Sequence, residues 1–183
     1  MDPDSSATRS LRNRSLLFLV FTLLAYFFMR GVSHGLSGKD IVAFEMAKTL
    51  EQAGSLLASW GDSVKADLLR SIYADHAFLV AYAVWLFYFC RYAGRLSGNY
   101  ILRNAARFFS WLAPLAALFD VAENAGMIYS LRVGLQPWVV HLTYDMAVLK
   151  FSLVFILLLF AGTGWLYWLI NRLTTRKFAR TGD

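Results

Sequence analysis

The stretch WLAPLAALFDVAENAGM, residues 111–127, decides the fold of this chain. It is apolar enough to cross a bilayer, yet it carries two acids and an amide within five residues. Asp120, Glu123 and Asn124 are spaced i, i+3, i+4, so a helix places them on one face. Because a carboxylate in a membrane is expensive, this face needs polar partners from other helices. The stretch therefore predicts a membrane-spanning helix that contributes to a polar site.

The rest of the chain supports a membrane protein. Of its 183 residues 58% are hydrophobic, against about 45–50% in soluble domains. Four long apolar runs account for the excess, and little is left for a soluble domain. We therefore expect an all-α, polytopic four-helix bundle, a single domain over 15–170. Its spans are expected at about 15–36, 71–90, 108–131 and 148–170.

The placement of positive charge predicts the orientation. The segments 1–14, 91–107 and 171–183 together hold 11 Arg and Lys residues, whereas the opposite connections with Arg30 hold six, mixed with acids. By the positive-inside rule, both termini are cytoplasmic. Residues 1–14 then form a disordered cytoplasmic tail and residues 171–183 a basic one. Because the basic residues flank the apolar runs, the net charge of +6 reflects topology and not nucleic-acid binding.

The first apolar run has two interpretations. A basic segment before a short apolar core is also typical of a cleaved signal peptide. No small-residue cleavage site follows the run, because the next residues are Arg30-Gly31-Val32-Ser33. A retained first span is therefore favoured, and the later topology is the same in both cases.

Residues 40–70 are expected to form an amphipathic helical segment on the extracytoplasmic side. Asp40 is a candidate N-cap, and Thr49 to Gln52 matches a capping box. Gly61 indicates a helix stop, and the following helix is expected to begin near Asp62 and run into the second span. Ten large apolar residues in this segment predict that it docks on the membrane surface or across the mouth of the bundle.

Some positions inside or at the ends of the apolar runs also carry predictions. Pro114 is expected to kink the third span near Ser110. Lys150 falls at the outer end of the last span, where its side chain is expected to extend to the interface. Cys90 is expected to be a buried, inert thiol, and Gly162-Thr163-Gly164 to allow close helix packing.

Unusual polar residues gather at the outer ends of the spans. Depth along the helices places Asp75, Asp120, Glu123 and Asn124 in the outer half of the bundle, where we expect a polar pocket. The rim of this pocket is predicted to carry further candidate ligands for a metal, His76, His141 and Asp145.

This convergence fits several functions. The polar residues could fix helix packing, bind an ion, proton or small polar ligand, or hold a divalent metal through carboxylate and histidine groups. Haem between His76 and His141 is a less favoured alternative. No HExxH motif, nucleophile elbow, phosphate loop or dinucleotide fingerprint is present, so an enzyme is less favoured than a binding protein.

The pattern Phe44-Glu45, Trp60, Asp75 and Asp120-x-x-Glu123-Asn124 resembles a group of small bacterial four-span membrane proteins of unassigned function. The resemblance covers roughly residues 40–130. It implies a bacterial inner membrane and adds Glu45 to the acidic site.

The function that we expect first is binding of a cation, proton or small polar ligand in the outer half of the bundle. One alternative is a non-catalytic structural or accessory subunit of a membrane complex, and another is a metal-dependent membrane enzyme. The expected partners are the lipid bilayer and either a second copy of the chain or another membrane subunit, with no nucleic acid.

Overall fold

The computed structural model describes residues 3–33 and 36–180 of the chain. Within these residues the secondary structure consists of helices, with no strand. Their order and bounds are α1 (Pro3–Val32), α2 (Gly38–Glu45), α3 (Leu50–Ser59), α4 (Asp62–Leu96), α5 (Tyr100–Ser110), α6 (Leu112–Arg132) and α7 (Pro137–Arg180).

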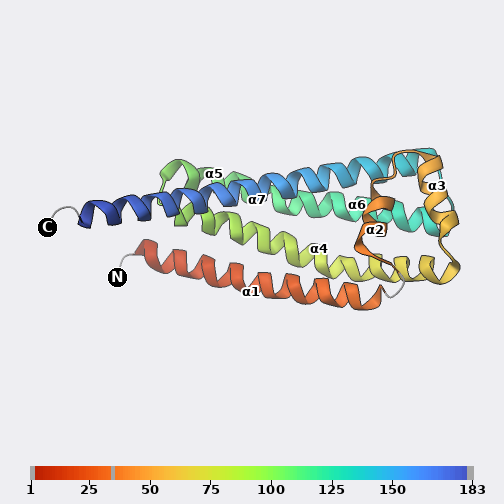
Figure 1. Cartoon of the computed structure of the whole chain (residues 1–183), viewed down its shortest axis with the longest axis horizontal. Coiled ribbons are helices and arrows are strands. Elements are labelled where there is room, and N and C mark those ends of the chain that lie inside the picture. The colour runs from red at the N-terminus through yellow and green to blue at the C-terminus, as the bar shows by residue number, and fades with distance from the viewer. Residues whose placement is uncertain (1–2, 34–35, 181–183) are drawn as a thin grey trace.

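Four helical segments are long and apolar enough to cross a membrane. They are Ser6–Val32, Asp62–Leu96, Tyr100–Arg132 and Pro137–Thr174, and the third combines α5 with α6. They run along the long axis of the molecule (Figure 1). Many of their large apolar side chains are exposed, such as Phe27, which is 66% exposed. The predicted all-α architecture with four candidate spans is confirmed, and it is that of a multi-pass membrane protein.

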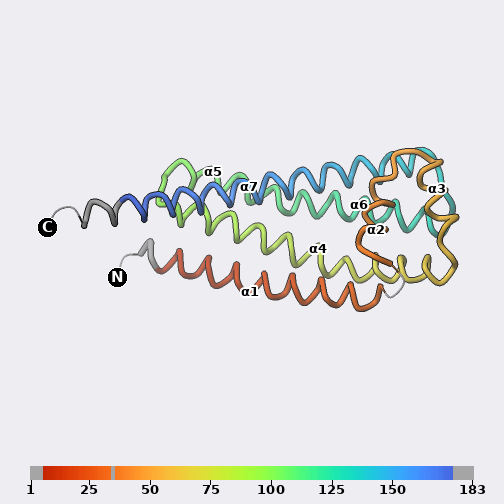
Figure 2. The backbone as a smooth tube through the Cα atoms, viewed as in Figure 1, coloured from red at the N-terminus to blue at the C-terminus, as the bar shows by residue number. Residues whose placement is uncertain are grey.

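The two ends of the bundle differ. Both termini lie at one end, which we call the terminal end, and α2 and α3 lie across the other, which we call the capped end (Figure 1). Helices α4, α6 and α7 pack on one another, whereas α1 lies along α4 (Figure 2). One side of α1 is therefore left without a helical neighbour.

The short helices at the capped end are defined by their caps. Thr49 caps α3 and forms the predicted capping box with Gln52. The N-cap predicted for α2, Asp40, was wrong by three residues. Ser37 is the N-cap, and Asp40 completes a capping box from the third helical position. An aspartate at that position accepts the backbone N–H of Ser37, so both residues satisfy otherwise unpaired groups. Helix α4 begins at Asp62 as predicted.

The predicted disorder of the N-terminal tail was wrong for residues 3–14, which belong to α1. Extending a helix that the apolar segment has already nucleated adds one hydrogen bond per residue, whereas nucleation is the unfavourable step. At the other terminus α7 likewise continues to Arg180. Residues 1–2, 34–35 and 181–183 lie outside the described residues.

The third span is interrupted where a kink was predicted. Helix α5 ends at Ser110 and α6 begins at Leu112, which puts Pro114 in the first turn of α6. A proline is tolerated there because the first backbone N–H groups of a helix have no intrahelical partner. The span also begins earlier than expected, at Tyr100, because Asn99 accepts hydrogen bonds from the backbone N–H groups of Ile101 and Leu102 and caps α5.

The core of the terminal half is built by close approach of small residues. A Cβ atom on Gly164 of α7 would lie 2.7 Å from the carbonyl oxygen of Ala93 on α4. A Cβ atom on Gly94 would clash with Ala106 of α5. Cys90 is fully buried in this core, as predicted. The expected close packing is thus confirmed for Gly164, whereas it was wrong for Gly162, which has open space around it.

Candidate ligand-binding site

Three helices bring charged residues to one level of the bundle. Asp75 and Lys150 each lie 13 residues after the first residue of their helix, and Asp120 lies 12 residues before the end of its helix. These helix ends are all at the capped end, so the three residues lie about 18–20 Å below it at 1.5 Å per residue. The shared level explains how side chains distant in sequence can meet.

Lys150 is the centre of a buried ion cluster. Its Nζ atom lies 2.8 Å from Glu123, 3.4 Å from Asp120 Oδ1 and 3.7 Å from Glu45 Oε2. We call these four residues the ion cluster. Lys150 is only 7% exposed, so the prediction that it extends to the interface was wrong. The physical reason is that the three carboxyl groups lie within reach of the ammonium and compensate its charge inside the bundle.

Two further hydrogen bonds connect the ion cluster to α4. The Tyr82 hydroxyl donates to Asp120 Oδ2 at 2.9 Å. The Asn124 side-chain amide donates to Asp75 Oδ2 at 2.7 Å. Asn124 follows Glu123 on α6, so the polar face predicted for this helix is used for contacts with both α4 and α7. The sequence prediction that this face needs partners from other helices is fulfilled by these contacts.

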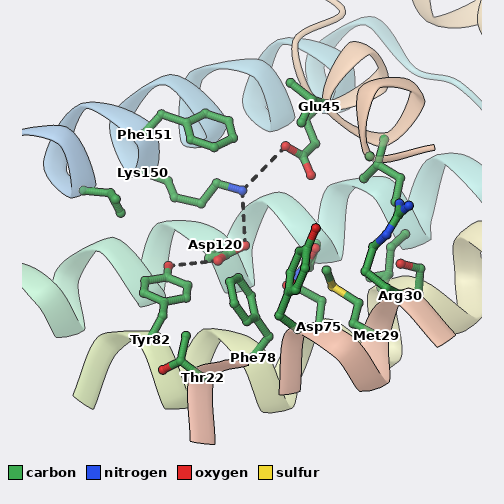
Figure 3. Close-up of a pocket in the computed structure, with 18 of the residues that line it drawn as sticks. Thr22, Met29, Arg30, Glu45, Asp75, Phe78, Tyr82, Asp120, Lys150 and Phe151 are labelled. Carbon is green, nitrogen blue, oxygen red and sulfur yellow. Dashed lines mark hydrogen bonds and ion pairs between the residues drawn. The ribbon is translucent and has the colours of Figure 1, made fainter. Parts of the chain in front are cut away.

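Glu45 reaches the ion cluster from outside the spans. It is the last residue of α2, and its side chain points from that helix toward Lys150 (Figure 3). The residue is 8% exposed, and its Oε2 atom has no hydrogen-bond partner. Burial raises the pKa of the Glu45 carboxyl above its ordinary value, and the negative charge of Asp120 adds to this, while Lys150 opposes it. Glu45 is therefore a buried acid with unused hydrogen-bonding capacity.

A cavity of about 380 Å³ adjoins the ion cluster, a size within the usual range for small-molecule sites. Glu45, Asp75, Asp120 and Lys150 lie on its wall, and Arg30 of α1 borders it near the capped end (Figure 3). The remaining wall is mostly apolar or aromatic and comes from α1, α2, α4, α6 and α7. The polar groups thus face a space that a ligand can occupy.

The formal charges around this cavity do not balance. Four carboxyl groups, those of Asp75 and the three acids of the ion cluster, stand against the two cationic groups of Lys150 and Arg30. An uncompensated charge in a low-dielectric interior is strongly unfavourable. Protons or a bound cation must therefore compensate the surplus of negative charge.

The structure separates the predicted site residues into two sets. Glu45, Asp75, Asp120, Glu123 and Asn124 are gathered as one site by the contacts described above. The second set, the candidate metal ligands, does not line the cavity. It comprises His76, which is exposed and whose Nδ1 atom lies 2.9 Å from the carbonyl oxygen of Ile72, and the exposed residues His141 and Asp145.

These positions bear on the metal and haem predictions. Among residues 3–33 and 36–180, the structure contains no group of three or more His, Cys, Asp or Glu side chains that could hold a metal ion. His76 and His141, the expected haem ligands, are both on the surface of the chain. The cation among the carboxylates of the site is the ammonium of Lys150.

Sequence reasoning missed three members of the site, Lys150, Tyr82 and Arg30. A usable signal was present for Lys150, because the polar face of α6 needs a positive partner and the clean apolar segment begins only one residue after it. Tyr82 had a weaker signal, since it lies seven residues after Asp75 on the same helical stripe. Arg30 had none beyond its position at the end of α1.

Comparisons of this chain with protein-family models, with curated proteins and with solved structures give no match.

Proposed function

We propose that this chain is a multi-pass membrane protein that binds a small organic cation in the cavity beside the ion cluster. The observation that carries the proposal is the surplus of carboxyl groups at the cavity, where Glu45, Asp75 and Asp120 line the wall and Glu123 of the ion cluster lies beside it. In the empty site protons compensate this surplus, and the incoming cation replaces them. Asp75 and Glu45 are the acids we assign to the ligand, because Lys150 is closer to Asp120 and Glu123 than to Glu45, and Asp75 is bonded to the neutral amide of Asn124.

The aromatic wall of the cavity supports a cationic ligand of organic type. Tyr26, Phe78, Tyr82 and Phe151 all line it. Aromatic faces attract ammonium groups through their quadrupole, and the effect is strongest where water is excluded. The Phe151 ring already does this for the protein's own cation, because Lys150 Nζ lies 4.5 Å from its centroid.

The proposal includes the orientation expected from charge. Arg9, Arg12, Arg91 and Arg107 lie in the helices at the terminal end, which we assign to the cytoplasm by the positive-inside rule. The capped end and its cavity then lie in the extracytoplasmic half. The bacterial inner membrane is the setting implied by the sequence resemblance.

The alternative is a structural or accessory subunit whose polar residues only fix helix packing. The contacts of Lys150 with Asp120 and Glu123, and of Tyr82 with Asp120, favour it, because such contacts join α4, α6 and α7. The two functions differ in their consequences for Asp75. A packing role predicts lower stability without any ligand, whereas a binding role predicts lost affinity in a folded protein.

The test measures binding of tetramethylammonium by calorimetry to the full chain in lipid nanodiscs. We expect saturable binding by the wild type and at least tenfold weaker binding by Asp75→Asn. The matched control is Asp145→Asn, which removes the same charge from an exposed position on α7 near the capped end. No binding by the wild type, or equal affinity in all three proteins, would overturn the proposal.

A further inference from the structure

The cavity is elongated along the bundle. Its wall on α4 extends from Ser71 to Leu86, and its wall on α1 and the residue that follows this helix extends from Thr22 to Ser33. At 1.5 Å per residue these walls are about 22 Å and about 16 Å long. A small cation by itself would fill only part of such a space.

The two ends of the cavity differ in polarity. The charged groups on the wall are concentrated toward the capped end, where Arg30, Glu45 and Asp75 lie. Trp85 and Leu86 lie 10 and 11 residues further along α4 than Asp75, about 15 Å closer to the terminal end. Val154 of α7 lies about 6 Å beyond Lys150 in the same direction. The cavity therefore has a charged head region and an apolar tail region.

One side of the cavity opens between α1 and α7. Tyr26 of α1 and Phe151 of α7 line the cavity and are 40% and 41% exposed. Val42 of α2, 43% exposed, lies above them at the capped end. Because α1 packs along α4 and has no comparable packing with α7, these two spanning helices leave a lateral mouth. Tyr26 and Phe151 lie within candidate spans, so the mouth faces the bilayer and not the aqueous phase.

From this shape, polarity and opening we infer that the ligand is a single-chain amphiphile with one cationic head, which enters sideways from the membrane between α1 and α7. The head lies against Asp75 and Glu45, and the alkyl chain lies against Trp85, Leu86 and Val154. This inference rests on the proposed function, because it names the class of cation that the same site binds. It adds the alkyl chain and the route of entry.

The test compares decyltrimethylammonium with tetramethylammonium on the full chain in lipid nanodiscs. We expect at least hundredfold tighter binding of the decyl compound by the wild type. The variants Val154→Trp and Thr22→Phe fill the tail region, so each is expected to reduce this advantage at least tenfold while leaving tetramethylammonium binding unchanged. The control is Val80→Trp, on an exposed position of α4 outside the cavity, which is expected to keep the advantage.

A second measurement, quenching of tryptophan fluorescence, does not depend on filling the cavity with a larger side chain. A decyltrimethylammonium with bromine at the end of its chain is expected to quench tryptophan fluorescence saturably, and Trp85→Phe is expected to remove that saturable part. Trp168→Phe, outside the cavity, is expected to keep it.

The outcomes separate the inference from the proposed function. If tetramethylammonium binds but the decyl chain adds nothing, or adds equally in the filled variants and in Val80→Trp, the cation site stands and the amphiphile is wrong. Saturable quenching that survives in Trp85→Phe would also contradict the amphiphile. If neither cation binds, the proposed function itself fails.

Discussion

The same three candidate spans, α4, α5 with α6, and α7, are packed in two different ways along their length. In the terminal half, α4 and α7 approach closely through Gly164 and Ala93, and α5 closes on α4 through Ala106 and Gly94. In the capped half, α4, α6 and α7 are joined by long charged side chains around Lys150, beside a cavity. Close packing of small residues leaves no room for a ligand. The capped half holds a cavity beside its charged side chains, although α6 and α7 also approach closely there, at Gly126 and Thr143.

This difference indicates a division of roles. Van der Waals contact between small residues holds membrane helices together without polar groups, so the terminal half provides a rigid base. The capped half keeps buried charges that a purely structural bundle would not need. Substitutions in the two halves should therefore differ in kind: those in the terminal half should change stability alone, and those in the capped half should change ligand binding as well.

The largest expected effect is that of Lys150→Met, which leaves three acids without their cation. We expect the free energy of unfolding in mild detergent to fall by about 3–5 kcal/mol, as for a buried ion pair that loses one partner. Adding Glu123→Gln should restore part of the loss. Lys65→Met, at a surface pair with Asp62, is the control and should change stability by about 0–1 kcal/mol. Equal effects of Lys150→Met and Lys65→Met would contradict the ion cluster.

In the terminal half the expected effect is steric. Gly164→Ala places a Cβ atom 2.7 Å from the Ala93 carbonyl oxygen, so α4 and α7 must separate. We expect a loss of about 1–3 kcal/mol in unfolding free energy and unchanged cation affinity. Gly162→Ala, two residues away in open space, should be neutral or slightly stabilising. A loss of cation binding in Gly164→Ala would show that the two halves are not independent.

Tyr82 tests the boundary between the halves, because it belongs to the apolar core cluster and also donates to Asp120. Tyr82→Phe keeps the ring and removes the hydrogen bond. We expect a loss of about 1 kcal/mol in unfolding free energy. The control is Tyr73→Phe, at an exposed position of α4, which should leave stability unchanged. Identical stabilities of the two variants would remove Tyr82 from the site.

The smallest expected effect is a pH dependence from Glu45. Its pKa in the folded protein is raised above the ordinary value of 4.5, mainly by burial. The stability that the protonated carboxyl contributes is therefore fully present below pH 4.5 and is lost as the pH rises through the raised pKa. Glu45→Gln should flatten the fall in unfolding free energy between pH 4 and pH 8. Glu51→Gln, at an exposed position of α3, should keep it, and a wild-type stability that rises over this range would contradict the assignment.

Much of the fold and part of the site could be predicted from the sequence. The spans follow from apolar length, and the polar face of α6 follows from the spacing of Asp120, Glu123 and Asn124. Lys150 was misplaced because a lysine near a helix end has two solutions, the interface or an internal carboxylate, and only the fold shows which is within reach. A polar pocket was expected beside these residues, but the extent of the cavity could not be predicted, because it depends on how α1 lies relative to α7.

The most direct test of the account counts the protons that leave when a cation binds. Calorimetric titration of the wild type with tetramethylammonium at pH 7, in buffers of different ionisation enthalpy, gives this number. We expect release of about one proton per bound cation. In the empty site, the carboxyl groups that have no cationic partner are protonated and therefore neutral, and the cation replaces a proton. We also expect a smaller release in Glu45→Gln. Binding without proton release, or with the same release in Glu45→Gln, would contradict the account.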